Sequence, residues 1–362
     1  MAWTDSMKKA VKVILFNLVL IIILLTLYES FILFLIRHPN ILKKCPMMIR
    51  NSIGHLYNTG DRRVIQFSPT CAKFDQDIGY TLKPGHCIFS GNEFSNWYYV
   101  NSLGLRDDEP SLDHPQIIVA GDSFAMGWGV NQEETFAQLI ERQTGLLVLN
   151  TAIASYGTAR EMMMLKRVPT DRLQYLIIQY CGNDYEENLS FFQNHNVLHI
   201  MKEDEYRHYT AMDNQNKTYF FGKYLLMEIE NRIKEIRKPH PTEKKPIDKD
   251  DVDLFINAIT QSNLDLKNVQ IIVFIMNGRN ADDNKAFPAV LKKRIARNDY
   301  PDYIRKMIVL DLSNVLQDDN FYVLDDHMNK SGHVIVANVL YKILSKEQLQ
   351  KTKFVVTDKK LN

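Results

Sequence analysis

Continuous apolar runs alternate with helical patterns between about residues 113 and 345. The runs are rich in β-branched residues, which is typical of strands buried on both faces. The five runs are Ile117–Ala120, Leu146–Leu149, Tyr175–Tyr180, Val269–Met276 and Met307–Leu310. Amphipathic stretches such as Glu134–Gln143 and Ala159–Arg167 fall between them, and a last helix is expected over Ser331–Leu344. This alternation predicts an α/β fold in which helices cover both faces of a parallel sheet.

The N-terminus has a different pattern, because Val13 to Ile36 is almost wholly apolar. About 20 helical residues suffice to cross a bilayer, so we expect residues 1–36 to form a short tail and a transmembrane anchor. A cleaved signal peptide is the alternative, but no small-x-small cleavage site follows Tyr28. Positive residues flank both ends of the span, so their count does not set its orientation. Glu29 would lie toward the outer end of the span.

Two further segments break the α/β rhythm. Residues 37–112 connect the anchor to the main domain, and their aromatic pieces and turn signals predict a compact antiparallel cap. An insertion at about 188–266 is too long for one crossover, and Tyr219–Arg237 within it carries apolar residues at helical spacing. Core packing is the ordinary interpretation of that stripe, and a lid or partner-binding arm is the functional alternative. A charged Pro/Lys stretch follows to Asp251, and residues 346–362 are expected to form a C-terminal tail.

Composition narrows the function classes. The chain has 362 residues and a formal net charge of +1, so no nucleic-acid-binding surface is implied. No zinc-type spacing occurs, and no metal or organic cofactor is expected. If the domain is exported, Cys71 and Cys87 could pair, although Cys45 is an equally available partner by sequence. Cys181 follows a buried strand and is expected to be a packed core thiol rather than a nucleophile.

One serine occupies the place where open α/β sheets put their active sites. The run Ile117–Ala120 leads directly into Gly121-Asp122-Ser123 and then into a helical pattern. Gly121 permits a sharp turn, and Asp122 can bond to its amides. A serine in this place is often only the N-cap of the next helix. A nucleophile also needs a base to take its proton and donors to receive an oxyanion.

Candidates for both needs follow later in the chain. The backbone N–H of Ser123, the N–H of Gly157 and the side-chain amide of Asn183 each come after a predicted strand, and could surround one developing negative oxygen. His327 lies just before the last helix, with Asp325 and Asp326 beside it. A carboxylate on an imidazole fixes its tautomer and stabilises the imidazolium. The competing base, His333, falls inside the helix and is expected to be a packing residue.

This block order resembles that of the SGNH, or GDSL-type, hydrolase superfamily over about residues 115–345. Asn101-x-x-Gly-x-Arg106, followed by Gly-Asp-Ser-Phe-x-x-Gly-x-Gly-Val, is similar to membrane-anchored bacterial members. The resemblance implies a three-layer α/β/α sandwich and a Ser-His-Asp site. The roles carried over fall on Ser123, His327 and an aspartate, with oxyanion donors at Ser123, Gly157 and Asn183.

The last block departs from the family spacing of Asp-x-x-His. Position 324 is Leu, so Asp325 stands two residues before His327 instead of three. The acid could therefore be Asp325, which we take as the first choice, or Asp326, or the pair could work with a backbone carbonyl.

The sequence therefore predicts a single-pass protein of the inner (cell) membrane with an extracytoplasmic serine esterase domain. The family's substrates are acyl esters of lipids, carbohydrates and cell-envelope polymers, so an ester of an envelope carbohydrate or lipid is expected. An O-acyltransferase on the same site is the first alternative. A non-catalytic domain that binds envelope glycan or acts as a scaffold is the second.

Overall fold

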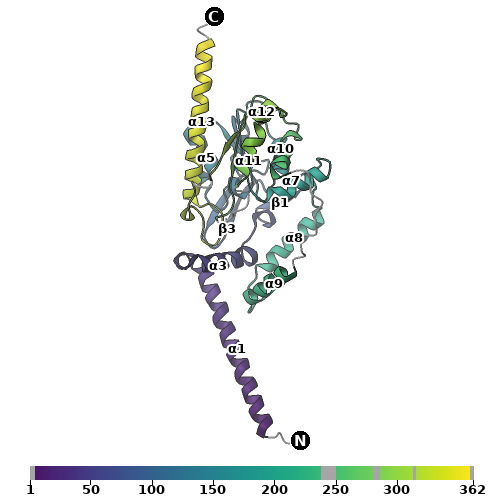
Figure 1. The fold of residues 1–362 in the computed structure, drawn as a ribbon, viewed down its shortest axis with the longest axis vertical. Coiled ribbons are helices and arrows are strands. Elements are labelled where there is room, and N and C mark those ends of the chain that lie inside the picture. The colour runs from purple at the N-terminus through teal and green to yellow at the C-terminus, as the bar shows by residue number, and fades with distance from the viewer. Residues whose placement is uncertain (1–4, 238–249, 280–285, 313–314, 359–362) are drawn as a thin grey trace. The chain divides into compact units, whose positions relative to one another are not determined.

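A computed structural model describes residues 5–237, 250–279, 286–312 and 315–358 (Figure 1). The chain divides into two compact units. The smaller comprises residues 1–62, 214–244 and 323–325, and the larger comprises the remainder. The charged Pro/Lys stretch expected after the insertion helix falls mostly at 238–249, outside the described residues.

A five-stranded sheet, parallel throughout, forms the centre of the larger unit. In spatial order its strands are β6 (Val148–Asn150), β5 (Ile117–Ala120), β7 (Tyr175–Tyr180), β8 (Gln270–Ile275) and β9 (Ile308–Leu310). The predicted bounds of β5 and β7 are confirmed to the residue, and those of the other three differ by one or two residues. Because β5 pairs with β6 on one side and β7 on the other, the strand order reverses beside β5, where open sheets bind ligands.

Helices pack on both faces of this sheet, which confirms the predicted α/β fold. Ile117 and Val119 belong to the same apolar cluster as residues of α5 and α13, whereas Ile118 and Ala120 share a second cluster with α6, α10 and α11. The helices of this unit are α4 (Ser123–Met126), α5 (Phe136–Thr144), α6 (Thr158–Leu165), α7 (Asp184–Gln193), α8 (Glu203–Asn216, whose last turn joins the smaller unit), α10 (Asp251–Thr260), α11 (Phe287–Ile295), α12 (Asp302–Arg305) and α13 (Lys330–Asp358).

The last helix is longer than the sequence pattern predicted. It was expected over Ser331–Leu344, with a separate tail from residue 346, but α13 continues to Asp358 (Figure 1). The reason is local, because residues 345–358 contain neither glycine nor proline and so carry no stop signal.

Two antiparallel hairpins precede the sheet in the larger unit. They pair β1 (Ala72–Asp75) with β2 (Gly79–Leu82) and β3 (Gly85–Ser90) with β4 (Ser95–Val100). A disulfide joins Cys71 to Cys87, which confirms that predicted pairing, while Cys45 and Cys181 are free thiols. The strands of the antiparallel cap thus occupy only residues 72–100 of the 37–112 region, since residues 37–62 are mostly helical and belong to the smaller unit.

The smaller unit is helical. Its elements are α1 (Asp5–Arg37), α2 (Pro39–Leu42), α3 (Met47–Gly60) and α9 (Lys223–Arg237), together with the short segment Val323–Asp325. Its core includes Leu35, Leu56, Tyr57, Tyr224 and Leu324. Among the described residues α1 is the helix long and apolar enough to cross a membrane, with a mean hydropathy of 2.8 over 18 residues. A signal sequence near the N-terminus passes the same test.

The insertion helix differs from its prediction in two ways. α9 begins at Lys223 rather than Tyr219, because Gly222 takes a φ of +90° and starts the helix after it. The apolar stripe was expected to pack in the core, but Phe221, Leu225 and Ile229 are exposed by 54, 37 and 45%. Short 3₁₀ turns complete the fold at Ile65–Phe67, Pro110–Leu112, Gln132–Glu134 and Asp318–Asn320.

Candidate active site

The turn after β5 sets the position of Ser123. Gly121 has a φ of +153°, and a Cβ there would fall 2.6 Å from the Gln179 Oε1 and 2.7 Å from the Ala125 Cβ, so only glycine fits. Asp122 is the N-cap of α4, and its carboxylate accepts the Phe124 N–H at 2.9 Å. Ser123 is therefore the first residue of α4 and is not its cap. Its hydroxyl is not committed to capping the helix.

Gln179 holds this turn from the neighbouring strand β7. Its Oε1 accepts the backbone N–H groups of Asp122 at 3.0 Å and Ala125 at 3.3 Å, and its side chain is fully buried. Its Nε2 donates to the Met276 carbonyl at 3.4 Å. The sequence reasoning missed this residue. A signal was present, because Gln179 is the one amide in the otherwise apolar run of β7.

His327 lies against Ser123. Its Nε2 is 2.7 Å from the Ser123 Oγ, within hydrogen-bonding distance. The imidazole stacks on Trp128, with ring centroids 4.7 Å apart and planes at 14°, and Phe124 lies 4.6 Å away on a tilted plane. Two aromatic rings therefore fix the imidazole, which is only 5% exposed. The predicted base and nucleophile are brought together with the geometry that proton transfer requires.

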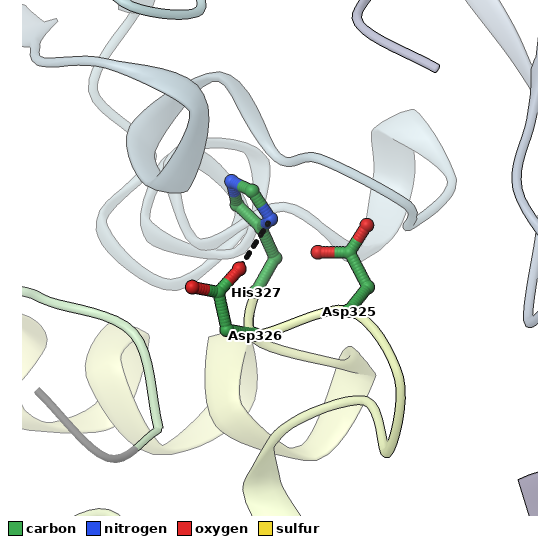
Figure 2. A group of neighbouring side chains, drawn as sticks. All are labelled: Asp325, Asp326 and His327. Carbon is green, nitrogen blue, oxygen red and sulfur yellow. Dashed lines mark ion pairs between the residues drawn. The ribbon is translucent and has the colours of Figure 1, made fainter. Parts of the chain in front are cut away.

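The carboxylates next to His327 differ in their surroundings. Figure 2 shows Asp325, Asp326 and His327, consecutive on the loop before α13, with the ion pair between Asp326 and His327 dashed. The Asp326 Oδ1 lies 3.7 Å from the His327 Nδ1, which is longer than a hydrogen bond, and Asp326 is half exposed. Asp325 is only 1% exposed and belongs to the smaller unit, where it lies 3.8 Å from a guanidinium nitrogen of Arg62. The choice of Asp325 as the acid stays a prediction.

The same three residues carry atoms of the kinds that bind metal ions. Each offers one possible ligand atom, and these atoms lie within 4.8 Å of one another. Acidic groups are common without an ion, and the imidazole already engages the serine hydroxyl through Nε2. We assign no metal to this group.

The two other predicted oxyanion donors are placed differently. Gly157 is the N-cap of α6, and its N–H donates to the Glu187 Oε1 at 3.0 Å. A Cβ on Gly157 would fall 2.9 Å from the Glu187 Cβ, so only glycine permits this close approach. Glu187 also pairs with Arg160 at 2.5 Å. Asn183 precedes α7 with an exposed side chain that makes no capping hydrogen bond. Sequence alone gave no sign of the Glu187 contact.

Buried carboxylates surround the strand ends. Burial raises the pKa of Asp122, while the N–H of Phe124 and the nearby His327 act in the opposite direction. Burial, and then repulsion from neighbouring acids, also raise the pKa values of Glu161 and Asp184. Thr158 donates its hydroxyl to Asp184 at 2.9 Å. These groups are held toward their neutral forms, so the interior below the site carries less negative charge than its composition suggests.

The motif Asn101-x-x-Gly-x-Arg106 supports the loop that follows α4. The buried Arg106 guanidinium donates to the carbonyls of Met126 at 3.2 Å and Val130 at 2.6 Å, and lies 3.6 Å over the Tyr98 ring. Asn101 accepts backbone N–H groups of its own turn through its Oδ1. The motif therefore fixes the segment that carries Trp128, the stacking partner of His327.

Two residues that the sequence placed outside the chemistry are structural. His333 is 1% exposed, its Nδ1 accepts the Phe136 N–H at 3.2 Å, and burial lowers its pKa to about 3. It is a neutral packing residue, as predicted. Cys181 is buried, its thiol lies 3.4 Å from the Asn277 Oδ1, and burial raises its pKa, so little of it is the reactive thiolate.

No protein-family model matches the chain, and no curated protein matches it. Similar solved structures include a lipolytic protein of the G-D-S-L family from Desulfitobacterium hafniense, with 12% identity, a TM-score of 0.34, and coverage of 63% of this chain and 99% of that one. Another is a carbohydrate esterase family 2 enzyme from Corynascus thermopiles, with 14% identity, a TM-score of 0.36, and coverage of 64 and 66%. An acylhydrolase from Bacteroides fragilis matches with 11% identity, a TM-score of 0.34, and coverage of 68 and 92%.

Proposed function

We propose that the larger unit is a serine hydrolase that cleaves ester-linked acyl groups. The observation that carries this proposal is the 2.7 Å contact between the Ser123 Oγ and the His327 Nε2 at the end of a central strand. A lone helix-start serine would not need a buried imidazole on its hydroxyl, because an N-cap uses the hydroxyl to accept backbone N–H groups. Here Asp122 does the capping instead.

The residues would act in a fixed order. Ser123 attacks the ester carbonyl carbon while His327 takes the hydroxyl proton, and the carbonyl electrons move onto oxygen. The imidazolium then protonates the departing alcohol, which leaves Ser123 acylated. Water attacks the acyl-enzyme with His327 as the base, releasing the acid and restoring the serine. Asp325 would orient the imidazole, and no step uses a metal or an organic cofactor.

The oxyanion would be held by the N–H of Ser123, the N–H of Gly157 and the side chain of Asn183. Asn183 is exposed and uncommitted to capping, which supports this role. The Gly157 amide is bonded to Glu187, so a substrate oxygen would have to replace that carboxylate. Each such donor is worth about 3 kcal/mol in acyl transfer.

The substrate class and the location are part of the proposal. We place the larger unit on the extracytoplasmic side of the inner (cell) membrane, with α1 as its anchor. Its substrate would be an acyl ester of an envelope carbohydrate or lipid. The Cys71–Cys87 disulfide supports an oxidising compartment, where such bonds persist. The apolar length of α1 supports attachment to a membrane.

The test is covalent labelling of the full chain with a fluorophosphonate probe, which reacts only with an activated serine. We expect one label, mapped to Ser123, which the Ser123→Ala variant loses and the variant of exposed Ser190, Ser190→Ala, retains. An unlabelled but folded wild-type protein would refute the proposal and favour a non-catalytic binding domain. Adding a saccharide acceptor to an ester assay separates the two enzymatic outcomes, because an acyltransferase would acylate the sugar.

A further inference from the structure

The outer face of α9 is apolar and uncovered. Leu226, Ile229 and Ile233 are exposed by 49, 45 and 41%, and Phe220 and Phe221, just before the helix, by 53 and 54%. The helical spacing of the three aliphatic residues puts them on one side of the helix. This outer face of α9 consists of Phe220, Phe221, Leu225, Leu226, Ile229 and Ile233. Such a row is larger than the scattered apolar residues normal on a soluble surface.

The inner face of the same helix is well packed within the smaller unit. Tyr224 is buried and donates its hydroxyl to Asp61 at 2.9 Å. Lys223 donates to the Gly60 carbonyl at 3.0 Å and pairs with Asp61 at 2.8 Å, at the end of α3. Asn231 lies 3.1 Å from the His55 Nε2. Because these contacts fix the rotation of α9, the apolar row must face away from α3.

A buried carboxylate ties the start of α9 to α1. Glu29 is 1% exposed although it stands in the apolar stretch of α1. Its Oε1 accepts the Leu225 N–H at 3.1 Å, and its Oε2 accepts the Tyr219 hydroxyl at 3.3 Å. An acid in a membrane-spanning helix needs such partners, and here the first turn of α9 and the segment just before it supply them.

This tie sets the level of α9 along α1. Glu29 lies eight residues before Arg37, the last residue of α1, which is about 12 Å along the helix axis. The nearby Phe31 and Phe34 of α1 are exposed by 53 and 45%. The outer face of α9 therefore lies at the level where α1 is still apolar near the end of the span, which is the level of the boundary between head groups and acyl chains.

We propose that the outer face of α9 binds the lipid bilayer and lies in the interface beside the anchor. The exposed charges that border the apolar row, Glu230, Arg232 and Lys234, are of mixed sign, so apolar burial and not attraction to anionic lipid supplies the binding. The smaller unit then contacts the membrane through two helices: α1 crosses the bilayer, and α9 lies along its surface. The proposal depends on α1 being a retained anchor and is independent of the esterase activity.

The test uses the full chain in phosphatidylcholine nanodiscs, with Cys45 and Cys181 replaced by serine and one cysteine carrying an environment-sensitive fluorophore. The probe sites are Phe221→Cys and Ile229→Cys on the outer face, and Ile22→Cys within the span. Two controls are Lys234→Cys on the charged border and Val334→Cys, an exposed apolar position in the larger unit. Each is challenged with a nitroxide-bearing lipid and with aqueous cobalt. Fluorophosphonate labelling of Ser123 in parallel reports the activity separately.

We expect the nitroxide lipid to quench the fluorophore at positions 22, 221 and 229. Cobalt should quench the fluorophore at these three positions at least threefold less than at positions 234 and 334. Quenching of position 229 by cobalt to the extent seen at 334, with position 22 protected, would overturn the proposal. Protection of 229 only in discs that hold two copies would also overturn it, because the occupant would be a second chain. Exposure of position 22 to cobalt would remove the anchor and the proposal together.

Discussion

The ends of β5 and β7 lie side by side in the sheet but are prepared for chemistry to different degrees. At the end of β5, Asp122 and Gln179 occupy the turn amides, and His327 lies on the Ser123 hydroxyl. At the end of β7, Asn183 is exposed and makes no capping bond. The Gly157 amide, which should assist it, is bonded to Glu187.

The difference separates two parts of one mechanism. Ser123 and His327, the proposed nucleophile and base, already lie within hydrogen-bonding distance of each other. Of the other two proposed oxyanion donors, the Gly157 N–H is bonded to Glu187 and the Asn183 side chain is exposed. Donors that engage only when charge develops act on the transition state more than on the bound substrate. Variants of the β5 end should therefore abolish turnover, and variants of the β7 end should weaken it.

The largest effect is expected from removal of the base. His327→Ala should lower kcat on a short-chain acyl ester by about 10⁴-fold or more, because the serine would lose its proton acceptor. Initial rates with the purified full chain measure it. Retention of more than a tenth of wild-type kcat by a folded variant would contradict the role of His327.

Two matched variants distinguish Asp325 from Asp326 as the carboxylate that orients His327. Asp325→Asn should lower kcat more than Asp326→Asn, because the buried Asp325 would stabilise the imidazolium and a neutral amide cannot. Since Asp326 is half exposed and 3.7 Å from the Nδ1, its replacement should matter less. The opposite order of the two kcat values would move the acid to Asp326.

Removal of Asn183 should have an intermediate effect. Asn183→Ala should lower kcat by about 100-fold, with little change in KM, as for known oxyanion-hole donors. Because its side chain makes no capping bond, the melting temperature should stay close to that of the wild type. A destabilised variant with normal kinetics would instead make Asn183 a loop residue.

Replacement of Gln179 should loosen the turn after β5 without removing any of the proposed reacting atoms. Gln179→Ala leaves two buried N–H groups without their acceptor, at a cost of about 1–3 kcal/mol for each. We expect about a tenfold loss in kcat together with a lower melting temperature. Gln270→Ala, at the opposite end of the neighbouring strand, is the control and should leave kcat unchanged. Equal kinetics for the two variants would remove the positioning role.

His333 should affect stability and have the smallest effect on turnover. Its pKa is about 3 in the folded chain and about 6.5 when unfolded, so between these pH values the unfolded state binds the extra proton. Stability present above pH 6.5 is therefore lost as pH falls, by roughly 3–5 kcal/mol at pH 3. His333→Gln should flatten that slope in urea titrations at several pH values, with kcat at neutral pH within about twofold of wild type. An unchanged slope would contradict the assignment.

The sequence predicted what depends on local patterns. β5 and β7 are apolar runs buried on both faces, with Gly121 and Gly182 just beyond them, so their bounds could be placed to the residue. The Ser123–His327 pair was anticipated because Ser123 directly follows an apolar strand run, where open sheets place active sites, and His327 lies beside two aspartates just before the last helix. The Cys71–Cys87 bond was anticipated because both cysteines lie in one small segment.

Contacts between distant side chains could not be predicted in the same way. The Gly157–Glu187 bond depends on how α7 packs against α6, and no local pattern encodes that packing. The exposure of Ile229 was also missed, because an apolar stripe at helical spacing looks the same whether it packs in a core or faces lipid. The hydrogen bonds of Gln179 could have been predicted from the sequence, because an amide among buried apolar strand residues must find hydrogen-bond partners.

Because Trp128 stacks on His327, its fluorescence should respond to the protonation state of the imidazole. The chain has three tryptophans, and Trp128 is the one whose ring lies 4.7 Å from the imidazole. A protonated imidazole on an indole face is a cation–π contact and an efficient acceptor of the excited electron, so it quenches the emission. In the proposed mechanism the ring carries that proton only between the attack of Ser123 and the departure of the alcohol, and it is neutral again in the acyl-enzyme. The emission of Trp128 can therefore follow the protonation of His327 in an unlabelled protein.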